Sequence, residues 1–254
     1  MKDKVVLITG ATAGIGEACA HKFAAAACRL IITGRREDRL QHLEKLLKEQ
    51  YGIEVLVRCF DVRNREETLQ QLNNLPGAFE QVDVLINNAG LASGFGPIQD
   101  GDFEDWDRMI DTNVKGLLNV SKAIMQGMVA RKRGHIINIA SIAGKEAYPN
   151  GNVYCASKHA VDALSKTMRI DLLPHGIRVT NIAPGMAETE FSLVRFHGDA
   201  GRAANVYKGI EPLTGKDIAE VVFFTAALPE NINLNDIVIT PRFQANATQA
   251  IRNA

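Results

Sequence analysis

The hydrophobic pattern along the chain alternates between short, nearly unbroken aliphatic runs and longer amphipathic stretches with helical spacing. Seven of the short runs have the length of β-strands, at residues 4–10, 29–34, 54–62, 83–90, 134–141, 178–185 and 235–241. Continuous apolar runs are typical of strands covered on both faces, and strands that alternate with helices favour parallel pairing. The pattern therefore predicts an α/β fold with a doubly wound, parallel, seven-stranded sheet and helices on both of its faces.

The chain length and apolar content favour a single domain. The chain has 254 residues, of which 46% are hydrophobic, and no repeat or linker divides it, so we expect one domain over residues 1–254. Two stretches interrupt the alternation: a glycine-rich segment at 94–102, and a segment at 186–211 with only modest helical periodicity. Long irregular segments in compact domains are often lids, so we expect the 186–211 segment to cover a site and select its substrate.

Charge, cysteine and histidine content narrow the classes of function. The 29 basic and 29 acidic residues cancel, which gives no reason to expect nucleic acid or an anionic membrane as a partner. No apolar run approaches the ~18 residues of a membrane span, so we expect a cytoplasmic protein. The four cysteines and six histidines show no metal-ligand spacing, so we expect reduced thiols and no bound metal.

Residues 141–158, SIAGKEAYPNGNVYCASK, carry the clearest candidate chemistry. Tyr154 and Lys158 are four residues apart, so on a helix they share one face. At ~4 Å and an effective dielectric of ~20, the ammonium would stabilise a phenolate by roughly 4 kcal/mol and lower the pKa of the tyrosine from about 10 toward about 7. Such a phenol can exchange a proton with an alcohol or carbonyl, and Ser141 could direct its hydroxyl at the same oxygen. A tyrosine and lysine at this spacing also occur by chance in many helices.

A glycine-rich turn follows the first predicted strand. The sequence TGATAGIG places Gly10, Gly14 and Gly16, together with Thr12 and Ile15, between a strand and a helix. Glycines here permit a tight turn, and the helix N-terminus offers N–H groups to a pyrophosphate, so the turn predicts dinucleotide binding in a Rossmann arrangement. The spacing is GxxxGxG and not the commoner GxGxxG.

Two arginines follow the second predicted strand. A doubly wound NAD site usually has an acidic residue at this point, whereas this chain has Arg35 and Arg36 and no carboxylate before Glu37. Guanidinium groups bind a 2′-phosphate through charge-assisted hydrogen bonds, so we expect NADP as the cofactor. The alternative is two solvated arginines at the start of a helix, where the helix dipole disfavours cations.

Together these motifs resemble the ordered motif set of the short-chain dehydrogenase/reductase family. The set comprises TGATAGIG, Asp61 in FDV, NNAG at 87–90, Asn113 in DTNVKG, Ser141, YCASK and PGMAETEF, and it covers nearly the whole chain. The stretches DTNVKGL, GNVYCASK and ETEFSLVRFHGD are further similar to the NADP-dependent 3-hydroxy acid dehydrogenases, a subgroup that includes serine and allo-threonine dehydrogenases.

The resemblance implies a role for each matched residue. Asn113, Ser141, Tyr154 and Lys158 would form the catalytic set, in which Ser141 and Tyr154 contact the substrate. Asn113 would distort its helix and bind a water that connects to Lys158, and Lys158 and Tyr154 would also contact the nicotinamide ribose. Asp61 would accept a hydrogen bond from the adenine amino group. The remaining cofactor contacts would come from Val62, Asn88, Ala89, Gly90, Pro184, Gly185 and Thr189.

The implied activity is NADP-dependent hydride transfer between NADP(H) and a secondary alcohol or its ketone. The subgroup resemblance implies a 3-hydroxy acid such as serine, allo-threonine or 3-hydroxyisobutyrate. Its carboxylate needs a fixed cation, for which Arg195 is the candidate, with a surface ion pair as the alternative role for this arginine. The apolar residues Phe191, Leu193, Val194 and Phe196 equally fit a pocket for bulkier neutral ketones. A catalytically silent NADP-sensing protein is a third interpretation, which the complete catalytic set disfavours.

The helical stretches 103–131 and 152–172 carry more apolar positions than one buried face needs. In related reductases the equivalent helices pair between subunits, so we expect a homo-oligomer, either a dimer or a tetramer. Alternatively, the two helices pack only on the sheet and on each other. The apolar positions include Met125, Met128, Ala156, Ala160, Ala163 and Leu164.

Overall fold

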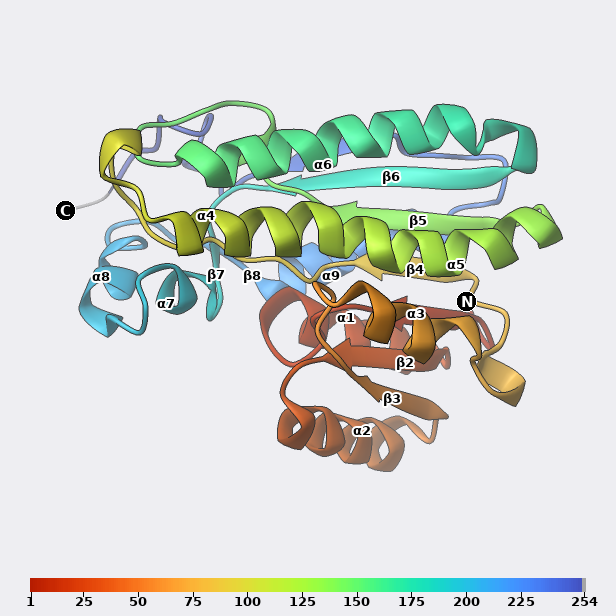
Figure 1. Ribbon diagram of the computed structural model, residues 1–254. Coiled ribbons are helices and arrows are strands. Elements are labelled where there is room, and N and C mark those ends of the chain that lie inside the picture. The colour runs from red at the N-terminus through yellow and green to blue at the C-terminus, as the bar shows by residue number, and fades with distance from the viewer. Residues whose placement is uncertain (253–254) are drawn as a thin grey trace.

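The computed structural model describes residues 1–252, so the last two residues of the predicted domain lie outside the described residues. Its main sheet has seven strands in the order β3-β2-β1-β4-β5-β6-β9, and all neighbouring pairs are parallel, which confirms the predicted doubly wound sheet (Figure 1). The direction of winding reverses between β1 and β4, and ligands of such sheets bind outside the carboxyl ends of the strands at this point. The strands are β1 (Val5–Ile8), β2 (Arg29–Gly34), β3 (Val55–Cys59), β4 (Val84–Asn87), β5 (Gly134–Ile139), β6 (Ile177–Pro184) and β9 (Asp236–Ile239).

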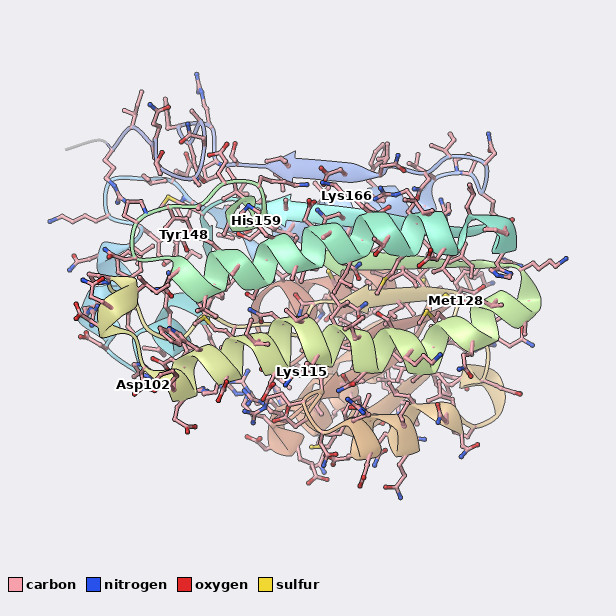
Figure 2. The ribbon with its side chains drawn as sticks, turned by 45° about the horizontal axis from the view of Figure 1, so that its top comes forward. Asp102, Lys115, Met128, Tyr148, His159 and Lys166 are labelled. Atoms are coloured by element: carbon pink, nitrogen blue, oxygen red, sulfur yellow. The ribbon has the colours of Figure 1, made fainter. Side chains whose placement is uncertain are left out.

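Helices cover both faces of the sheet. One face carries α1 (Gly14–Ala25), α2 (Glu37–Tyr51) and α9 (Gly215–Ala227). The other carries α3 (Arg65–Asn73), α5 (Leu117–Arg131) and α6 (Asn152–Asp171), with α4 (Phe103–Ile110) leading into α5. Figure 2 shows α5 and α6 side by side across this second face. Short 3₁₀ turns lie at Gly77–Phe79, Ile98–Asp100, Ile142–Gly144 and Leu173–His175.

The inner strands are buried on both sides because successive side chains point to opposite faces of the sheet. In β1, Val6 and Ile8 pack into the core beneath α1, α2 and α9, whereas Val5 and Leu7 pack into the core beneath α3, α5 and α6. Two apolar cores therefore share one sheet, which is why these strands are continuous apolar runs in the sequence.

Several strands end earlier than their apolar runs predicted. The runs at 4–10, 54–62 and 83–90 form strands only over Val5–Ile8, Val55–Cys59 and Val84–Asn87. The later residues of each run leave the sheet at its carboxyl end and line a cleft there. Phe60 and Val62, for example, are buried at this cleft, so their apolar character reflects burial there and not strand pairing.

The helical stretch predicted at 103–131 is interrupted. Helix α4 ends at Ile110, a π-helical turn spans Asp111–Gly116, and α5 begins at Leu117. Such turns are rare and frequently lie at functional sites. This one buries Asn113, whose side chain is 2% exposed.

The outer surface of α4, α5 and α6 retains apolar side chains. Phe103 is 75% exposed and Ile170 is 70% exposed, and Ala156 and Ala163 are also on the surface. Met128 does not contribute to this surface: it is fully buried in the core beneath α5, where its side chain packs against Gly134 (Figure 2). Fewer of the apolar positions in these helices are therefore exposed than the sequence predicted, but some of them, such as Phe103 and Ile170, remain on the surface.

The 186–211 segment contains three short elements, one strand and two helices, and is followed by a further short strand. Strand β7 (Ala187–Glu188) pairs with β8 (Leu213–Thr214), and helices α7 (Phe191–Arg195) and α8 (Ala200–Asn205) lie between them in the chain. In Figure 1 these helices lie at the left of the view, beyond the sheet. None of the described helices is long and apolar enough to cross a membrane.

Candidate active site

A cleft with a volume of ≈ 900 Å³ lies between the carboxyl ends of the strands and the 186–211 segment. Of the residues predicted for the site, Gly16 and Asn113 lie outside its lining. The others all line it: Gly10, Thr12, Gly14, Ile15, Arg35, Arg36, Asp61, Val62, Asn88, Ala89, Gly90, Ser141, Tyr154, Lys158, Pro184, Gly185, Thr189 and Arg195. The fold thus gathers residues from six strand ends at one place.

The glycine turn after β1 has the conformation that only glycine adopts readily. Gly10 and Gly14 have φ angles of +66° and +58°, in the left-handed region. A Cβ on Gly16 would clash with the carbonyl oxygen of Gly10, so this glycine permits α1 to pack closely on the turn. Ala13 occupies the N-cap position of α1 and has no side-chain acceptor, which leaves the first N–H groups of the helix for another partner.

The two arginines after β2 differ in their contacts. Arg36 donates from Nη2 to Thr12 Oγ1 at 2.9 Å and from Nη1 to Glu190 Oε2 at 2.8 Å. Arg35 lies with its Nη1 3.8 Å from Asp61 Oδ2. The Asp61 carboxylate is itself held by Arg63, whose Nη2 donates to Oδ2 at 2.7 Å. An adenine amino group at Asp61 would therefore share the carboxylate with a guanidinium.

The loop after β4 is tied to the loop after β1. Asn88 donates from Nδ2 to the carbonyl oxygens of Thr9 and Gly10, at 2.9 and 3.1 Å, and the backbone N–H of Ala89 donates to Thr9 Oγ1 at 2.9 Å. Asn88 therefore holds the two loops together with its side chain. Gly90 follows, and its small size lets the Lys158 ammonium come close to the loop.

Helix α6 places Tyr154 and Lys158 on one face, one turn apart, as their spacing predicted. Both are buried, at 7% and 6% exposure, and the Lys158 Nζ lies 6.0 Å from the centroid of the Tyr154 ring. Lys158 Nζ donates to the carbonyl oxygen of Ile139 at 2.9 Å. Ser141 follows β5 and is half-buried, and its Oγ accepts a hydrogen bond from the N–H of Ala143 at 3.1 Å.

The pKa values correct the electrostatic prediction for this pair. Burial is the main cause that raises the pKa of Tyr154, with Tyr148 adding to it, while Ser141 and Arg195 act in the opposite direction. Burial likewise lowers the pKa of Lys158 to about 8. The predicted fall of the tyrosine pKa toward neutrality is therefore wrong for this arrangement, because desolvation outweighs the groups that favour the phenolate.

Asn113 lies in the π-helical turn with all of its side-chain contacts inside the protein. Its Nδ2 donates to the carbonyl oxygen of Leu91 and to Ser157 Oγ, at 2.8 and 2.9 Å, and its Oδ1 accepts from the N–H of Leu91 at 2.8 Å. The distortion of the helix that the resemblance implied is present. The side chain bonds to Leu91 and Ser157, and the water that would connect Asn113 to Lys158 stays a prediction of the resemblance.

Arg195 reaches from α7 into the cleft. Its Nη1 donates to Tyr148 Oη at 3.0 Å, and its guanidinium carbon lies 4.6 Å from the Phe95 ring centroid and 5.5 Å from that of Tyr154. Among residues 1–252 it forms no ion pair with a carboxylate, so this structure does not support the alternative role of Arg195 in a surface ion pair. A charged guanidinium held by aromatic rings beside the Tyr154 phenol is available to an anionic group.

The apolar residues around Arg195 divide into two sets. Phe191, Val194 and Phe196 line the cleft, and the Phe191 ring packs edge-on against Tyr154 with centroids 5.5 Å apart. Leu193 does not line the cleft and is 40% exposed, which corrects its predicted place in a pocket.

Sequence reasoning missed several residues of this cleft. Tyr148 and Phe95 line it beside Arg195, and both lie in stretches that the sequence singled out, so their aromatic character was a usable signal. Gln244 also lines it, 6% exposed, with its Oε1 accepting from the N–H of Met186 at 2.8 Å. No local pattern marks Gln244, because it reaches the site only through the course of the chain after β9.

The fold and the cleft together define a dinucleotide-dependent oxidoreductase, and the chain belongs to the short-chain dehydrogenase family: residues 4–198 match that family, described as short chain dehydrogenase. An NADP-dependent 3-hydroxy acid dehydrogenase, YdfG of Salmonella typhi, is 45% identical over 98% of this chain and 100% of its own. Sulfoacetaldehyde reductase 2 of Chromohalobacter salexigens is 44% identical over 97% of this chain and 98% of its own. The closed form of serine dehydrogenase complexed with NADP⁺ superposes with a TM-score of 0.92 and is 43% identical over 98% of this chain and 100% of that chain.

Proposed function

We propose that this NADP-dependent oxidoreductase acts on a small alcohol, or the corresponding carbonyl compound, that carries an acidic group, with 3-hydroxy acids such as serine, allo-threonine and 3-hydroxyisobutyrate as the first candidates. The supporting observation is the Arg195 guanidinium, which is held beside the Tyr154 phenol and forms no ion pair with a carboxylate among residues 1–252. A guanidinium binds a planar carboxylate with two parallel hydrogen bonds.

A short sulfonated aldehyde is the second candidate substrate. The 44% identity to a sulfoacetaldehyde reductase favours it, and a sulfonate presents the same kind of anionic oxygens to Arg195 as a carboxylate does. Bulkier neutral ketones, the alternative left open by the apolar residues, would place uncharged atoms against this guanidinium. They would offer no negative charge to a cation that forms no ion pair among residues 1–252.

The residues present fit NADP(H). The left-handed glycines and the uncapped start of α1 suit a pyrophosphate, and Arg35 and Arg36 suit a 2′-phosphate. The loop from Asn88 to Gly90 and the turn after Pro184 would line the rest of the cofactor. When bound, NADP(H) supplies or accepts the hydride.

In this proposal the protein supplies the proton and the positioning. Tyr154 keeps its proton because burial raises its pKa, so it is the proton donor to a carbonyl oxygen and takes the proton back in the oxidative direction. Ser141 donates a hydrogen bond to the same oxygen as charge develops on it. The Lys158 ammonium stabilises the phenolate once it forms. Arg195 fixes the acidic end of the substrate.

The test is a panel of initial rates with NADP(H) at fixed pH. The panel compares L- and D-serine, the allo-threonines, 3-hydroxybutyrate, 3-hydroxyisobutyrate and sulfoacetaldehyde with neutral alcohols and bulky ketones. We expect the acids to be preferred, and Arg195→Leu to raise KM for the acids while sparing the neutral compounds. Arg242→Leu is the matched control, because this guanidinium also stacks on an aromatic ring, 5.2 Å from the centroid of Phe243, and does not line the cleft. Neutral ketones that outperform every acid in the parent enzyme would contradict the proposal.

We also propose that the chain acts as one domain over residues 1–254, with the 186–211 segment as its lid, and that it assembles as a homodimer or homotetramer. The exposed Phe103 and Ile170 on the outer surface of α4–α6 support assembly. A cytoplasmic location is consistent with the use of NADP(H) and with free thiols at Cys19, Cys28, Cys59 and Cys155.

A further inference from the structure

A carboxylate of the 186–211 segment lies on the arginines that follow β2. Glu190 accepts hydrogen bonds from Arg36 Nη1 to Oε2 at 2.8 Å and from Arg39 Nη1 to Oε1 at 2.6 Å. The three side chains are 40–44% exposed. The hydrogen bond from Arg39 is the main cause that lowers the pKa of Glu190, so the carboxylate is ionised at neutral pH. Glu190 is therefore an internal anion bound at a basic site.

The position of Glu190 in the chain connects two parts of the cleft. It directly precedes α7, and α7 carries Arg195 over the Tyr154 ring. The preceding residue, Thr189, lies against the glycine turn, since a Cβ built on Gly14 would meet its side chain at 3.1 Å. A displacement of Glu190 would therefore act on the start of the helix that holds the substrate cation.

We propose that Glu190 competes with the 2′-phosphate of NADP(H) for Arg36 and Arg39, so that binding of this phosphate releases the start of α7. The proposal rests on the proposed contact between the 2′-phosphate and the arginines after β2. Two anions at the same guanidinium groups repel each other, and the phosphate carries the larger charge. Arg39 becomes a third cation of this site, which sequence reasoning did not name. NAD(H) has a neutral hydroxyl in place of this phosphate, so it does not displace Glu190.

The competition is measured by calorimetry with two nucleotides that lack nicotinamide. The probes are 2′,5′-ADP and 5′-AMP, which differ by the 2′-phosphate alone. We expect the parent protein to prefer 2′,5′-ADP. Glu190→Gln should tighten its binding by about three- to tenfold and change that of 5′-AMP by less than about twofold, because exposed ion pairs are each worth only a small factor. Glu188→Gln is the matched control, because it removes the same charge only two positions away in the chain. The Glu188 carboxylate forms no ion pair among residues 1–252, so this change should alter neither affinity.

The release of α7 is measured by hydrogen exchange of its backbone amides. The N–H of Val194 donates to the carbonyl oxygen of Glu190, and that of Phe196 to Ser192. In the parent, 2′,5′-ADP should accelerate exchange of these amides and 5′-AMP should not, whereas Glu190→Gln should exchange fast without either probe.

The possible failures are distinct. A parent protein with no preference for 2′,5′-ADP would rule out the proposed contact between the 2′-phosphate and the arginines, and therefore also the competition with Glu190. A parent that prefers 2′,5′-ADP, combined with a Glu190→Gln variant of equal or weaker affinity, would overturn the competition while leaving the proposed function intact. A gain in affinity without any change in exchange would overturn the release of α7.

Discussion

Burial dominates the ionisation of both titratable groups at the reaction centre. Tyr154 and Lys158 are each less than a tenth exposed. Burial raises the pKa of the phenol and lowers that of the ammonium to about 8, so each group resists its charged form. The spacing of the two residues predicts that they are neighbours, but it does not predict how far the fold shields them from solvent. A neutral phenol is the form that donates a proton to a carbonyl.

We expect Lys158 to make the stability of the protein depend on pH between about 8 and 10.5. Its folded pKa of about 8 lies below its ordinary value of 10.5, so in this window the unfolded chain binds a proton that the folded chain does not. The free energy of unfolding should therefore rise with pH by up to about 1.4 kcal/mol per pH unit, and the full cost of charging the buried lysine is present below the window. Urea unfolding of the parent and Lys158→Met at several pH values checks this.

Comparing the parent with Lys158→Met isolates the contribution of Lys158 to the pH dependence of stability. Buried thiols such as Cys19 and Cys28 also titrate at high pH, but they are common to both proteins and cancel in the difference. A difference in unfolding free energy that stays flat across the window would show that Lys158 keeps its charge on folding.

At the scale of elements, we expect the loop after β2 to determine the choice of cofactor. Replacing Arg35 and Arg36 by Ala should weaken NADP(H) binding by about tenfold or more and leave NAD(H) binding nearly unchanged, because only NADP(H) has a 2′-phosphate for a charge-assisted hydrogen bond. Fluorescence titration with NADPH and NADH checks this. Equal losses for both cofactors would mean that these arginines only support the fold.

The π-helical turn is held in place by Asn113. We expect Asn113→Ala to lower the free energy of unfolding by about 2–3 kcal/mol, because it leaves the buried N–H and carbonyl groups of Leu91 without partners. Asn119→Ala, in the same run of helix, loses a single hydrogen bond to Val62 and should cost about 1 kcal/mol. Urea unfolding of both variants gives the comparison, and equal small losses would contradict this role of Asn113.

Contacts within one element could be predicted from the sequence, and contacts between distant elements could not. The pitch of a helix alone places Tyr154 and Lys158 on one face, and the parallel sheet gathers the strand ends. By contrast, the Glu190–Arg36 and Gln244–Met186 contacts join residues 154 and 58 positions apart, and no periodicity relates them. The predicted strands ran too long for a related reason, since apolar residues beneath the cleft continue the strand pattern.

At the scale of the whole molecule, we expect the chain to sediment as a dimer or tetramer at micromolar concentration. Phe103 and Ile170 expose most of their apolar surface on α4–α6, and burying such surface between subunits is favourable by about 25 cal/mol per Å². Ile170→Glu should shift the protein toward smaller species, whereas Leu46→Glu, which also replaces an exposed apolar side chain but lies on α2 at the other face of the sheet, should shift it less. A parent that sediments as a monomer would exclude this surface as a stable interface.

The measurement that tests the central claim most directly is NADPH consumption with a small acidic carbonyl compound by the parent and by Tyr154→Phe, together with the affinity of each for NADPH. The account predicts turnover in the parent, turnover lower by ~10²–10⁴ in Tyr154→Phe, and nearly equal NADPH affinities, because the variant loses only the proton that the phenol transfers. Tyr51→Phe, which alters a tyrosine paired with His21, should keep the parent turnover. Turnover of Tyr154→Phe within a few-fold of the parent, or a parent that binds NADPH and consumes none with any carbonyl compound, would contradict the account.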